Sequence, residues 1–186
     1  MNTLRLLPIA CLAAIALPTL AAEPYAGLSR TTPGEATITA AGKTPLDNDN
    51  SPLAFKLYGG LKLSDEWAVE AGYGAFGSYH FSDPGTGFRA RQSVSAVTGA
   101  ARYSLSLGES FTVFGKLGLA FNRVRFTNSL GLAAQQTFVR PMWGFGAEYR
   151  LTRQLSVPLE FEYMGRSRAL GDFRQEKLAL GLRYQF

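Results

Sequence analysis

The single histidine of the chain, His80, lies two residues after Ser78 and three before Asp83, so the residue types of a serine hydrolase occur together. Serine hydrolysis requires the nucleophile and the base to be within hydrogen-bond reach of each other. Side chains two positions apart on a strand share a face but stand about 7 Å apart by the strand rise. We therefore interpret His80 as a residue at the base of a loop and expect the chain not to be an enzyme.

The sequence offers little for a metal ion or a cofactor. No second histidine is present, and the only cysteine, Cys11, lies in an N-terminal segment that we expect to be removed. A zinc site built from nitrogen and sulfur ligands therefore has no donors. The glycines recur inside strand-like segments and none opens a helix after a strand, as a phosphate-binding loop requires. We expect no cofactor.

Charged side chains supply the remaining chemistry, because they recur on one face of segments that are apolar on the other face. Charges confined inside a small barrel must be paired or hydrogen-bonded, which predicts a salt-bridged plug that closes the lumen. The alternative is a narrow ion path in which the excess of lysine and arginine favours anions. The predicted lumen charge network consists of Lys56, Lys62, Glu70, Arg102, Lys116, Glu148, Arg150, Glu160, Glu162, Lys177 and Arg183.

The elements that position these charges are strands, because apolar and polar residues alternate with a period of two. Each segment has about ten residues, the length with which a tilted strand crosses a bilayer. The apolar face is continuous and the charges lie opposite, which places lipid outside rather than an apolar core inside. The eight predicted strands are residues 25–32, 53–63, 67–75, 91–105, 111–121, 143–151, 155–163 and 178–186.

The connections between these segments alternate in length. Short ones fall at residues 64–66, 106–110 and 152–154, and longer polar ones at 33–51, 80–89, 127–135 and 167–172. Short periplasmic turns and longer outer loops are typical of bacterial outer-membrane barrels. The sequence therefore predicts an all-β protein, an eight-stranded antiparallel up-and-down transmembrane β-barrel, formed by residues 23–186.

Residues 1–22 are predicted to be a cleaved signal peptide. One positive charge at Arg5 precedes an apolar run to Leu17, and small residues follow as far as Ala22. This is the order of a secretory signal, and the apolar run is too short for a membrane-spanning helix. We place the cleavage after Ala21 or Ala22. The excess of 19 Lys and Arg over 14 Asp and Glu would suit nucleic acid, but export excludes that partner.

The segments 55–61, 67–73, 113–119, 143–149 and 180–186 resemble, in this order, the OmpA-type outer-membrane barrel family. The resemblance implies insertion by the barrel-assembly machinery, with Leu182, Tyr184 and Phe186 as the recognition signal. It covers the barrel and no peptidoglycan-binding domain, so the chain is closer to barrel-only members of the OmpX or OmpW kind. A cell-wall anchoring role is therefore not implied.

A group of arginines lies near the ends of the predicted strands that lead into the long loops. Their guanidinium groups suit lipopolysaccharide phosphates, or else an acidic host or surface polymer. We expect a monomer of the Gram-negative outer membrane, because a closed barrel has no free edge. We expect a structural or surface-interaction role, with a narrow channel as the alternative and a lipid-modifying enzyme as a weaker one. The predicted lipopolysaccharide contacts are Arg123, Arg125, Arg140, Arg166, Arg168 and Arg174.

Overall fold

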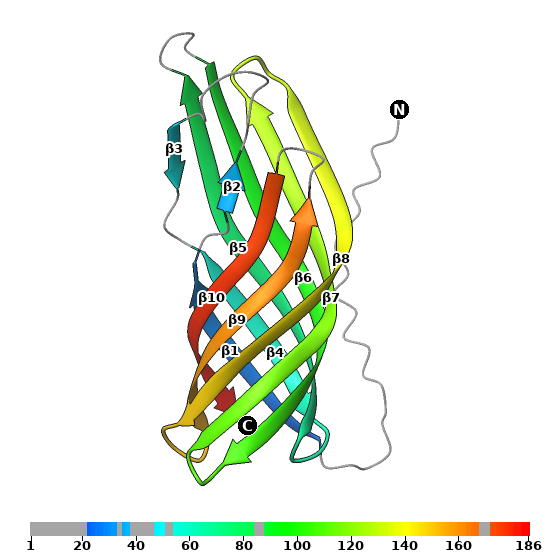
Figure 1. Cartoon of the computed structure of the whole chain (residues 1–186), viewed down its shortest axis with the longest axis vertical. Coiled ribbons are helices and arrows are strands. Elements are labelled where there is room, and N and C mark those ends of the chain that lie inside the picture. The colour runs from blue at the N-terminus through cyan, green and yellow to red at the C-terminus, as the bar shows by residue number, and fades with distance from the viewer. Residues whose placement is uncertain (1–21, 33–34, 38–46, 51–53, 84–87, 168–171) are drawn as a thin grey trace.

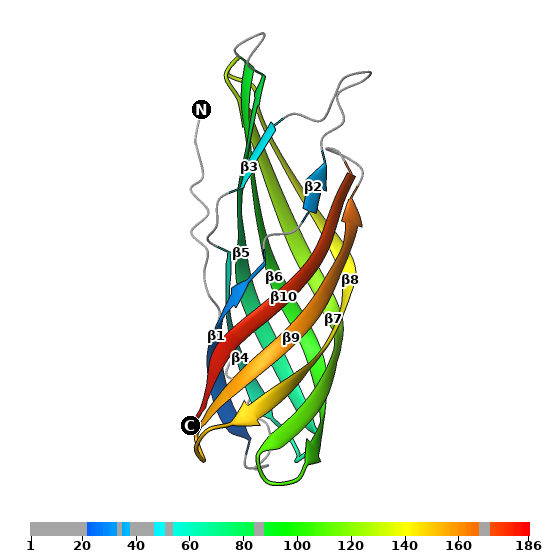
Figure 2. The ribbon, with the colours of Figure 1, turned by 60° about the vertical axis from the view of Figure 1, so that its left-hand side comes forward.

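The structure is a computed structural model that describes residues 22–32, 35–37, 47–50, 54–83, 88–167 and 172–186. These residues form strands joined by short turns (Figures 1 and 2). The predicted signal peptide lies outside the described residues except for Ala22. The strands are β1 (Glu23–Thr31), β2 (Glu35–Thr37), β3 (Asp47–Asn50), β4 (Phe55–Lys62), β5 (Trp67–Asp83), β6 (Phe88–Leu107), β7 (Phe111–Asn128), β8 (Ala133–Arg150), β9 (Leu155–Ser167) and β10 (Asp172–Gln185).

Eight of these strands close into a barrel. Strands β1 and β4 to β10 each pair antiparallel with the next, and β10 pairs with β1 from Tyr25↔Gln185 to Thr31↔Ala179. The predicted eight-stranded antiparallel barrel is therefore confirmed. The two short strands come from the segment predicted as the loop 33–51: β2 pairs antiparallel with the first residues of β10, and β3 pairs with β5. In the described residues no helix is long and apolar enough to cross a membrane.

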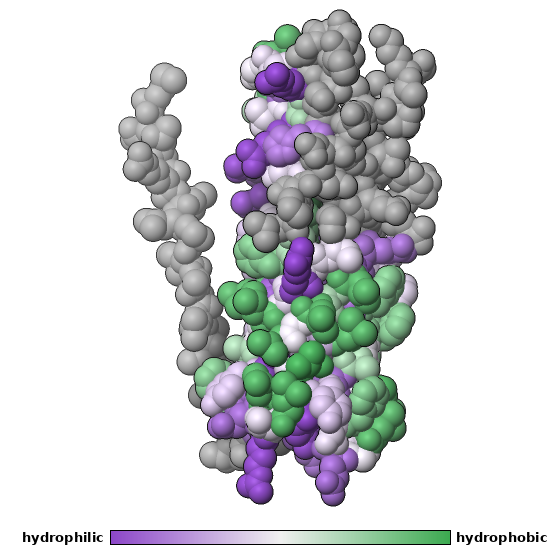
Figure 3. Space-filling view, turned by 90° about the vertical axis from the view of Figure 1, so that its left-hand side faces the viewer, coloured by the Kyte–Doolittle hydropathy of each residue, from purple (hydrophilic) through white to green (hydrophobic). Residues whose placement is uncertain are grey.

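The outer surface of the barrel carries a broad apolar belt, visible in green in Figure 3. The side chains that form it are large and exposed, for example Leu117 at 71% and Leu180 at 57%. Alternate residues of the same strands point inward and are buried, among them Lys116 and Ala179. This is the inverse of a soluble protein, and it is the arrangement that the alternating sequence predicts.

Several strands are longer than the sequence predicted. Strand β6 has 20 residues, and β7 and β8 have 18 each. Most of the predicted loops 80–89 and 127–135 is therefore strand, and His80 lies within β5 and not at the base of a loop. The β7–β8 turn is tight, because the side chain of Asn128 accepts hydrogen bonds from the backbone N–H groups of Leu130 and Leu132 at 3.1 and 3.0 Å.

Two β-bulges bend the long strands. The β5–β6 register shifts between Ala75 and Ser78, where Gly77 has a φ of +91°. The β9–β10 register shifts near Gly165, where φ is +90°. A bulge inserts one unpaired residue, and a left-handed backbone at that point favours glycine. After the first bulge the even-numbered residues of β5, such as Ser78, take over the outward positions that Ala75 and the odd-numbered residues hold below it.

The interior changes character along the barrel axis. Towards the short turns it holds buried charges, and towards the loop end it holds apolar side chains. We call this second region the apolar layer; it is packed around Phe76 and Met164, both 0% exposed. Its buried members are Phe76, Ala90, Val94, Ala96, Ala120, Val124, Met142 and Met164.

Candidate functional site

The barrel brings five buried charges from four strands into one ion-pair network. Lys116 on β7 lies 2.6 Å from a carboxylate oxygen of Glu70 on β5 and 2.6 Å from one of Glu160 on β9. Lys56 on β4 contacts Glu162, and it lies 3.4 Å from Glu160 and 3.7 Å from Glu70. Each lysine thus bridges carboxylates from opposite sides of the barrel.

Glycines on neighbouring strands make room for these side chains. A Cβ at Gly144 would stand 3.3 Å from Cγ of Glu162 and 2.8 Å from the carbonyl oxygen of Phe161. A Cβ at Gly72 would stand 3.4 Å from Cε of Lys56. The glycines that alternate with outward aromatics in the sequence therefore leave space in the lumen for long charged side chains.

A second cluster lies nearer the short turns. Glu148 on β8 accepts a hydrogen bond from Nη2 of Arg102 at 2.6 Å, and its other oxygen lies 2.8 Å from Nη2 of Arg183. The guanidinium of Arg102 also lies 3.9 Å from the ring centre of Phe114. The ring centre of Tyr25 lies 4.8 Å from the guanidinium of Arg183, and its hydroxyl donates to Glu70 at 3.2 Å, which links this cluster to the ion-pair network.

The remaining predicted lumen charges occupy three different settings. Lys177 is 1% exposed, and its ammonium lies 3.6 Å from the ring centre of Phe76, with no hydrogen-bond acceptor among the described residues. Lys62 is half-buried at the turn-side mouth, 2.9 Å from Asp65. This contact holds the pKa of the Asp65 carboxyl below its ordinary value. Arg150 is exposed at the rim, and no ion pair joins it to a described residue.

The residues that suggested hydrolase chemistry do not form a triad in the described part of the chain. Ser78 lies on the outer face of β5, where its hydroxyl is 3.3 Å from that of Ser93 and accepts a hydrogen bond from Arg91 at 3.2 Å. No described hydrogen bond joins Ser78 to His80, which is exposed, and the side chain of Asp83 lies outside the described residues. In those residues, no group of three His, Cys, Asp or Glu could hold a metal ion.

The apolar belt ends abruptly on the β5–β8 side. Its last members are Tyr73, Val97, Phe121 and Val139, which pair across four adjacent strands and are 45–53% exposed; we call them the boundary row. In the next two outward rows the side chains are small or polar, with Arg123 and Arg125 on β7. The outer face changes from apolar to basic between successive outward residues, Phe121 and Arg123, and this marks the level at which the hydrocarbon of the membrane ends.

A depression lies on this wall directly above the boundary row. It has a volume of about 380 Å³, and small residues form its floor while Arg123 and Arg125 flank it. Arg125 donates to Gln135 at 3.4 Å, whereas Arg123 has no described partner. We call it the outer-wall groove; its lining residues are Tyr73, Ala75, Gly77, Ser78, Ser93, Val94, Ser95, Arg123 and Arg125.

Of the other predicted lipopolysaccharide contacts, only Arg140 has a described side chain, and it does not line this groove. Arg140 is exposed on β8 and donates to the carbonyl oxygen of Val139 at 3.4 Å. Its guanidinium lies 5.4 Å from the ring centre of Phe138. Arg168 lies outside the described residues, as do the side chains of Arg166 and Arg174.

The predicted assembly signal forms the end of the closing strand. Leu182 and Tyr184 are exposed on the outer face of β10, and Phe186 follows the strand. The rings of Tyr184 and Phe186 meet edge to face with their centres 5.1 Å apart. The backbone N–H of Phe186 donates to the carbonyl oxygen of Pro24 at 3.1 Å, so the last residue is tied to the first strand.

Comparison with known proteins agrees with this architecture. No curated protein sequence matches the chain significantly. Solved structures that resemble it include Ail of Yersinia pestis in complex with the heparin analogue sucrose octasulfate, with 16% identity and a TM-score of 0.57 over 89% of this chain and 97% of Ail. Neisserial surface protein A shows 15% identity and a TM-score of 0.58 over 89% of this chain and 97% of its own.

OprG of Pseudomonas aeruginosa is similar at 14% identity, with a TM-score of 0.60 over 89% of this chain and 96% of its own. At these identities the likeness shows the fold. The family model described as "Outer membrane protein beta-barrel domain" matches residues 7–186, almost the whole chain. With the apolar belt outside and the charges inside, this match places the protein in the Gram-negative outer membrane. The chain belongs to the outer membrane protein β-barrel family.

Proposed function

We propose that this protein is a surface-interaction barrel of the outer membrane whose lumen is closed and whose loop-side wall contacts the phosphates of lipopolysaccharide. The observation that carries the proposal is the order of features along the strands. An ion-pair network and an apolar layer fill the interior, and the outer wall becomes basic directly above the boundary row.

Closure is supported by how fully the interior charges are engaged. Lys56 and Lys116 each lie within 3.7 Å of two or three carboxylates, and both are at most 3% exposed. An ion that entered would have to displace these contacts in a region of low dielectric constant, which is costly. It would next meet the apolar layer at Phe76 and Met164, where the polar groups are few: the ammonium of Lys177 and the buried side-chain amides of Gln92 and Asn122.

Contact with lipopolysaccharide is supported by the outer-wall groove. Guanidinium groups match phosphate oxygens in geometry, and Arg123 and Arg125 are successive outward residues about 7 Å apart by the strand rise. Tyr73 lines the lower edge of the groove and also belongs to the apolar belt, so an acyl chain of the bound lipid would lie below it. Ail, which shares the fold, was solved with a sulfated heparin analogue, so a basic wall could also serve adhesion to acidic polymers.

Planar-bilayer conductance of the mature protein refolded into lipid tests closure. We expect a folded barrel without discrete openings, and a heat-dependent gel-mobility shift verifies folding. Reproducible openings whose ion selectivity changes in a Lys116→Glu variant would contradict closure and would favour the narrow channel instead.

Binding of purified lipopolysaccharide by the refolded barrel tests the wall. The double variant Arg123→Gln, Arg125→Gln should bind more weakly by about tenfold, because exposed ion pairs contribute up to about 1 kcal/mol each and tenfold corresponds to about 1.4 kcal/mol. The matched control is Arg30→Gln with Arg89→Gln, which removes the same charge at exposed positions that line neither the groove nor another described pocket. An equal loss of affinity in both double variants would show a general effect of net charge and would contradict binding at the outer-wall groove.

We also propose that the barrel-assembly machinery recognises Leu182, Tyr184 and Phe186, and that the folded protein is a monomer. The exposed ends of these side chains and the absence of a free edge in the closed ring support both statements. Replacement of Phe186 with serine should reduce the amount of barrel in the outer membrane while leaving refolding in detergent unchanged. Normal insertion of this variant would remove Phe186 from the signal.

A further inference from the structure

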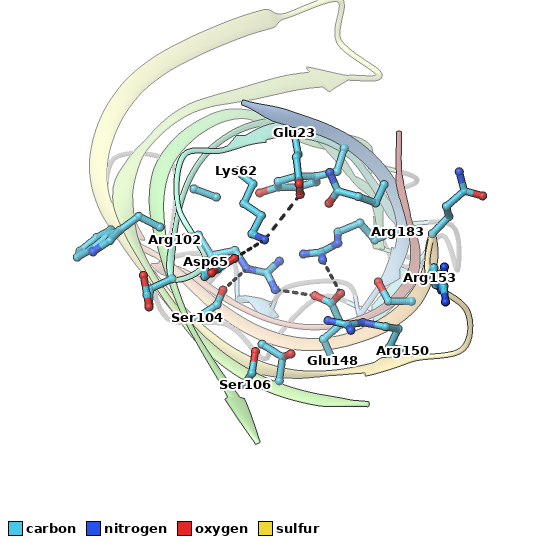
Figure 4. Close-up of a pocket in the computed structure, with 18 of the residues that line it drawn as sticks. Glu23, Lys62, Asp65, Arg102, Ser104, Ser106, Glu148, Arg150, Arg153 and Arg183 are labelled. Carbon is cyan, nitrogen blue, oxygen red and sulfur yellow. Dashed lines mark hydrogen bonds and ion pairs between the residues drawn. The ribbon is translucent and has the colours of Figure 1, made fainter. Parts of the chain in front are cut away.

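A cavity of about 660 Å³ opens at the turn-side end of the barrel, below the ion-pair network. We call it the turn-side vestibule (Figure 4). Arg102, Glu148 and Arg183 form its inner end, and the turns at residues 64–66 and 152–154 form its rim. Short turns face the periplasm in bacterial barrels, so the vestibule opens towards that compartment. Its volume is typical of cavities that hold small molecules.

Positive charge exceeds negative charge on one side of the vestibule. Arg102 and Arg183 share the single carboxylate of Glu148, at 2.6 and 2.8 Å. Arg150 and Arg153 line the same side and form no ion pair with a described residue. In Figure 4, Arg150 lies beside Glu148 on this side. Among the described lining residues here, three guanidinium groups thus lie around one carboxylate, while Arg153 lies at the outer edge of the view in Figure 4.

The opposite side of the vestibule carries the other carboxylates, so the excess of positive charge is confined to the arginine side. Lys62 already engages Glu23 at 3.6 Å and Asp65 at 2.9 Å, and Figure 4 shows Glu23 and Lys62 across the vestibule from Arg150. Glu66 accepts a hydrogen bond from the hydroxyl of Ser64 at 3.1 Å. The vestibule lining as a whole thus has five cationic groups and four carboxylates, and its positive charge is concentrated on the arginine side.

The arginine side also carries unused hydrogen-bond donors. The Nε–H of Arg183 is buried and has no acceptor among the described residues. The hydroxyl of Ser104 accepts a hydrogen bond from Nε of Arg102 at 3.1 Å, so its own proton is free to donate. Hydroxyls of Ser106 and Thr112 line the same wall. Guanidinium and hydroxyl donors around an unbalanced positive charge are the groups that bind carboxylates and phosphates.

We propose that the turn-side vestibule binds an oxyanion, a carboxylate or a phosphate, carried by a small periplasmic molecule. Arg183 and Arg150 hold the oxyanion, and the rest of the molecule occupies the space towards the rim. The ligand enters and leaves from the same side, because the ion-pair network lies above it. Binding of the oxyanion does not depend on the outer-wall groove or on closure of the lumen, which decides only the route of entry, and its test is separate from theirs.

Isothermal titration calorimetry of the whole mature barrel, refolded in a nonionic detergent at constant ionic strength, tests the proposal. The probes are inorganic phosphate, N-acetyl-dialanine with a free carboxylate, and the same peptide with an amidated end. The variants are Arg150→Gln, at the exposed rim, and Arg183→Gln, which leaves the Arg102–Glu148 pair in place. Arg89→Gln removes the same charge at the far end of the barrel and is the matched control.

We expect saturable binding of one oxyanion per barrel, weakened at least about tenfold by Arg150→Gln and by Arg183→Gln and unchanged by Arg89→Gln. Binding of phosphate alone would identify a phosphorylated ligand, and binding of the free-carboxylate peptide alone a carboxylate ligand. Binding of the amidated peptide with equal affinity, equal loss in Arg89→Gln, or no saturable binding by the wild type would overturn the proposal. If Arg183→Gln does not refold, Arg150→Gln alone decides.

Discussion

Replacement of Lys116 with methionine is the sharpest perturbation of the interior. The side chain is 1% exposed and lies 2.6 Å from both Glu70 and Glu160. Methionine keeps much of its length and removes its charge. Glu70 and Glu160 then have only Lys56 as a described cationic partner, at 3.7 and 3.4 Å. Lys56 also contacts a third carboxylate, that of Glu162.

The expected loss of unfolding free energy is about 3–5 kcal/mol, the range for a buried charge whose partner is removed. The matched control is Lys62→Met, whose ion pairs lie at the mouth with side chains 35–91% exposed. Exposed pairs contribute about 0–1 kcal/mol, so this variant should stay within that range. The contrast between the two lysines separates burial from charge.

The assay is denaturant unfolding of the barrel in lipid vesicles, followed by the fluorescence of Trp67 and Trp143. The double variant Lys116→Met, Glu160→Gln should recover part of the loss, because one of the two orphaned carboxylates becomes neutral. A loss below about 1 kcal/mol in Lys116→Met would refute the reasoning, since the ion pairs would then contribute no more than exposed ones.

Three further predictions concern packing and the mouth. Gly118→Ala should destabilise the barrel by about 1–3 kcal/mol in the same assay, because a Cβ there would stand 2.6 Å from Cα of Ala100, its pairing partner on β6. In the control Gly99→Ala the added Cβ meets no atom within 4 Å, so the stability should be unchanged. Phe76→Ala should cost about 3–5 kcal/mol through the cavity it leaves, and equal stability would contradict a packed apolar layer. In Lys62→Met the pKa of Asp65, followed by NMR titration, should rise to its ordinary value, because the contact with Lys62 is what lowers it. In the wild type the Lys62–Asp65 contact is present above this lowered pKa and is lost as the pH falls through it.

The membrane-spanning part of the fold could be predicted from the sequence because its physical demand is local. On β7, the odd-numbered residues from Phe111 to Phe121 are apolar and face lipid, while Lys116 faces the lumen. The length and the alternation of this pattern both follow from the bilayer. The partners of the charges could not be predicted, because Lys56 and Glu162 are 106 positions apart and meet only when the barrel closes.

The loop-side half was missed, although its signal is present in the sequence. Beyond Phe121 the alternation continues with its polarity reversed: Val124 is buried inside, and Arg123 and Arg125 are outside. The period of two is unchanged, but the outward residues are no longer apolar, so the apolar pattern that predicts a membrane strand ends at Phe121 and the following residues read as a loop. The bulge at Gly77 hides the same reversal on β5, because it moves the outward positions by one residue.

The reversal on β7 also sets how far the protein stands off the cell. Seven residues of β7 lie beyond Phe121, as far as Asn128. At about 3.3 Å per residue and a strand tilt of about 40°, they raise the β7–β8 turn roughly 18 Å above the hydrocarbon. Because these strands pack on the apolar layer, we expect this part of the barrel to be rigid. Leu130 and Leu132 in the turn, 75% and 65% exposed, are then held at a fixed height among the sugars of the cell surface. Shortening both strands by an even number of residues would lower that platform without turning any side chain to the wrong face.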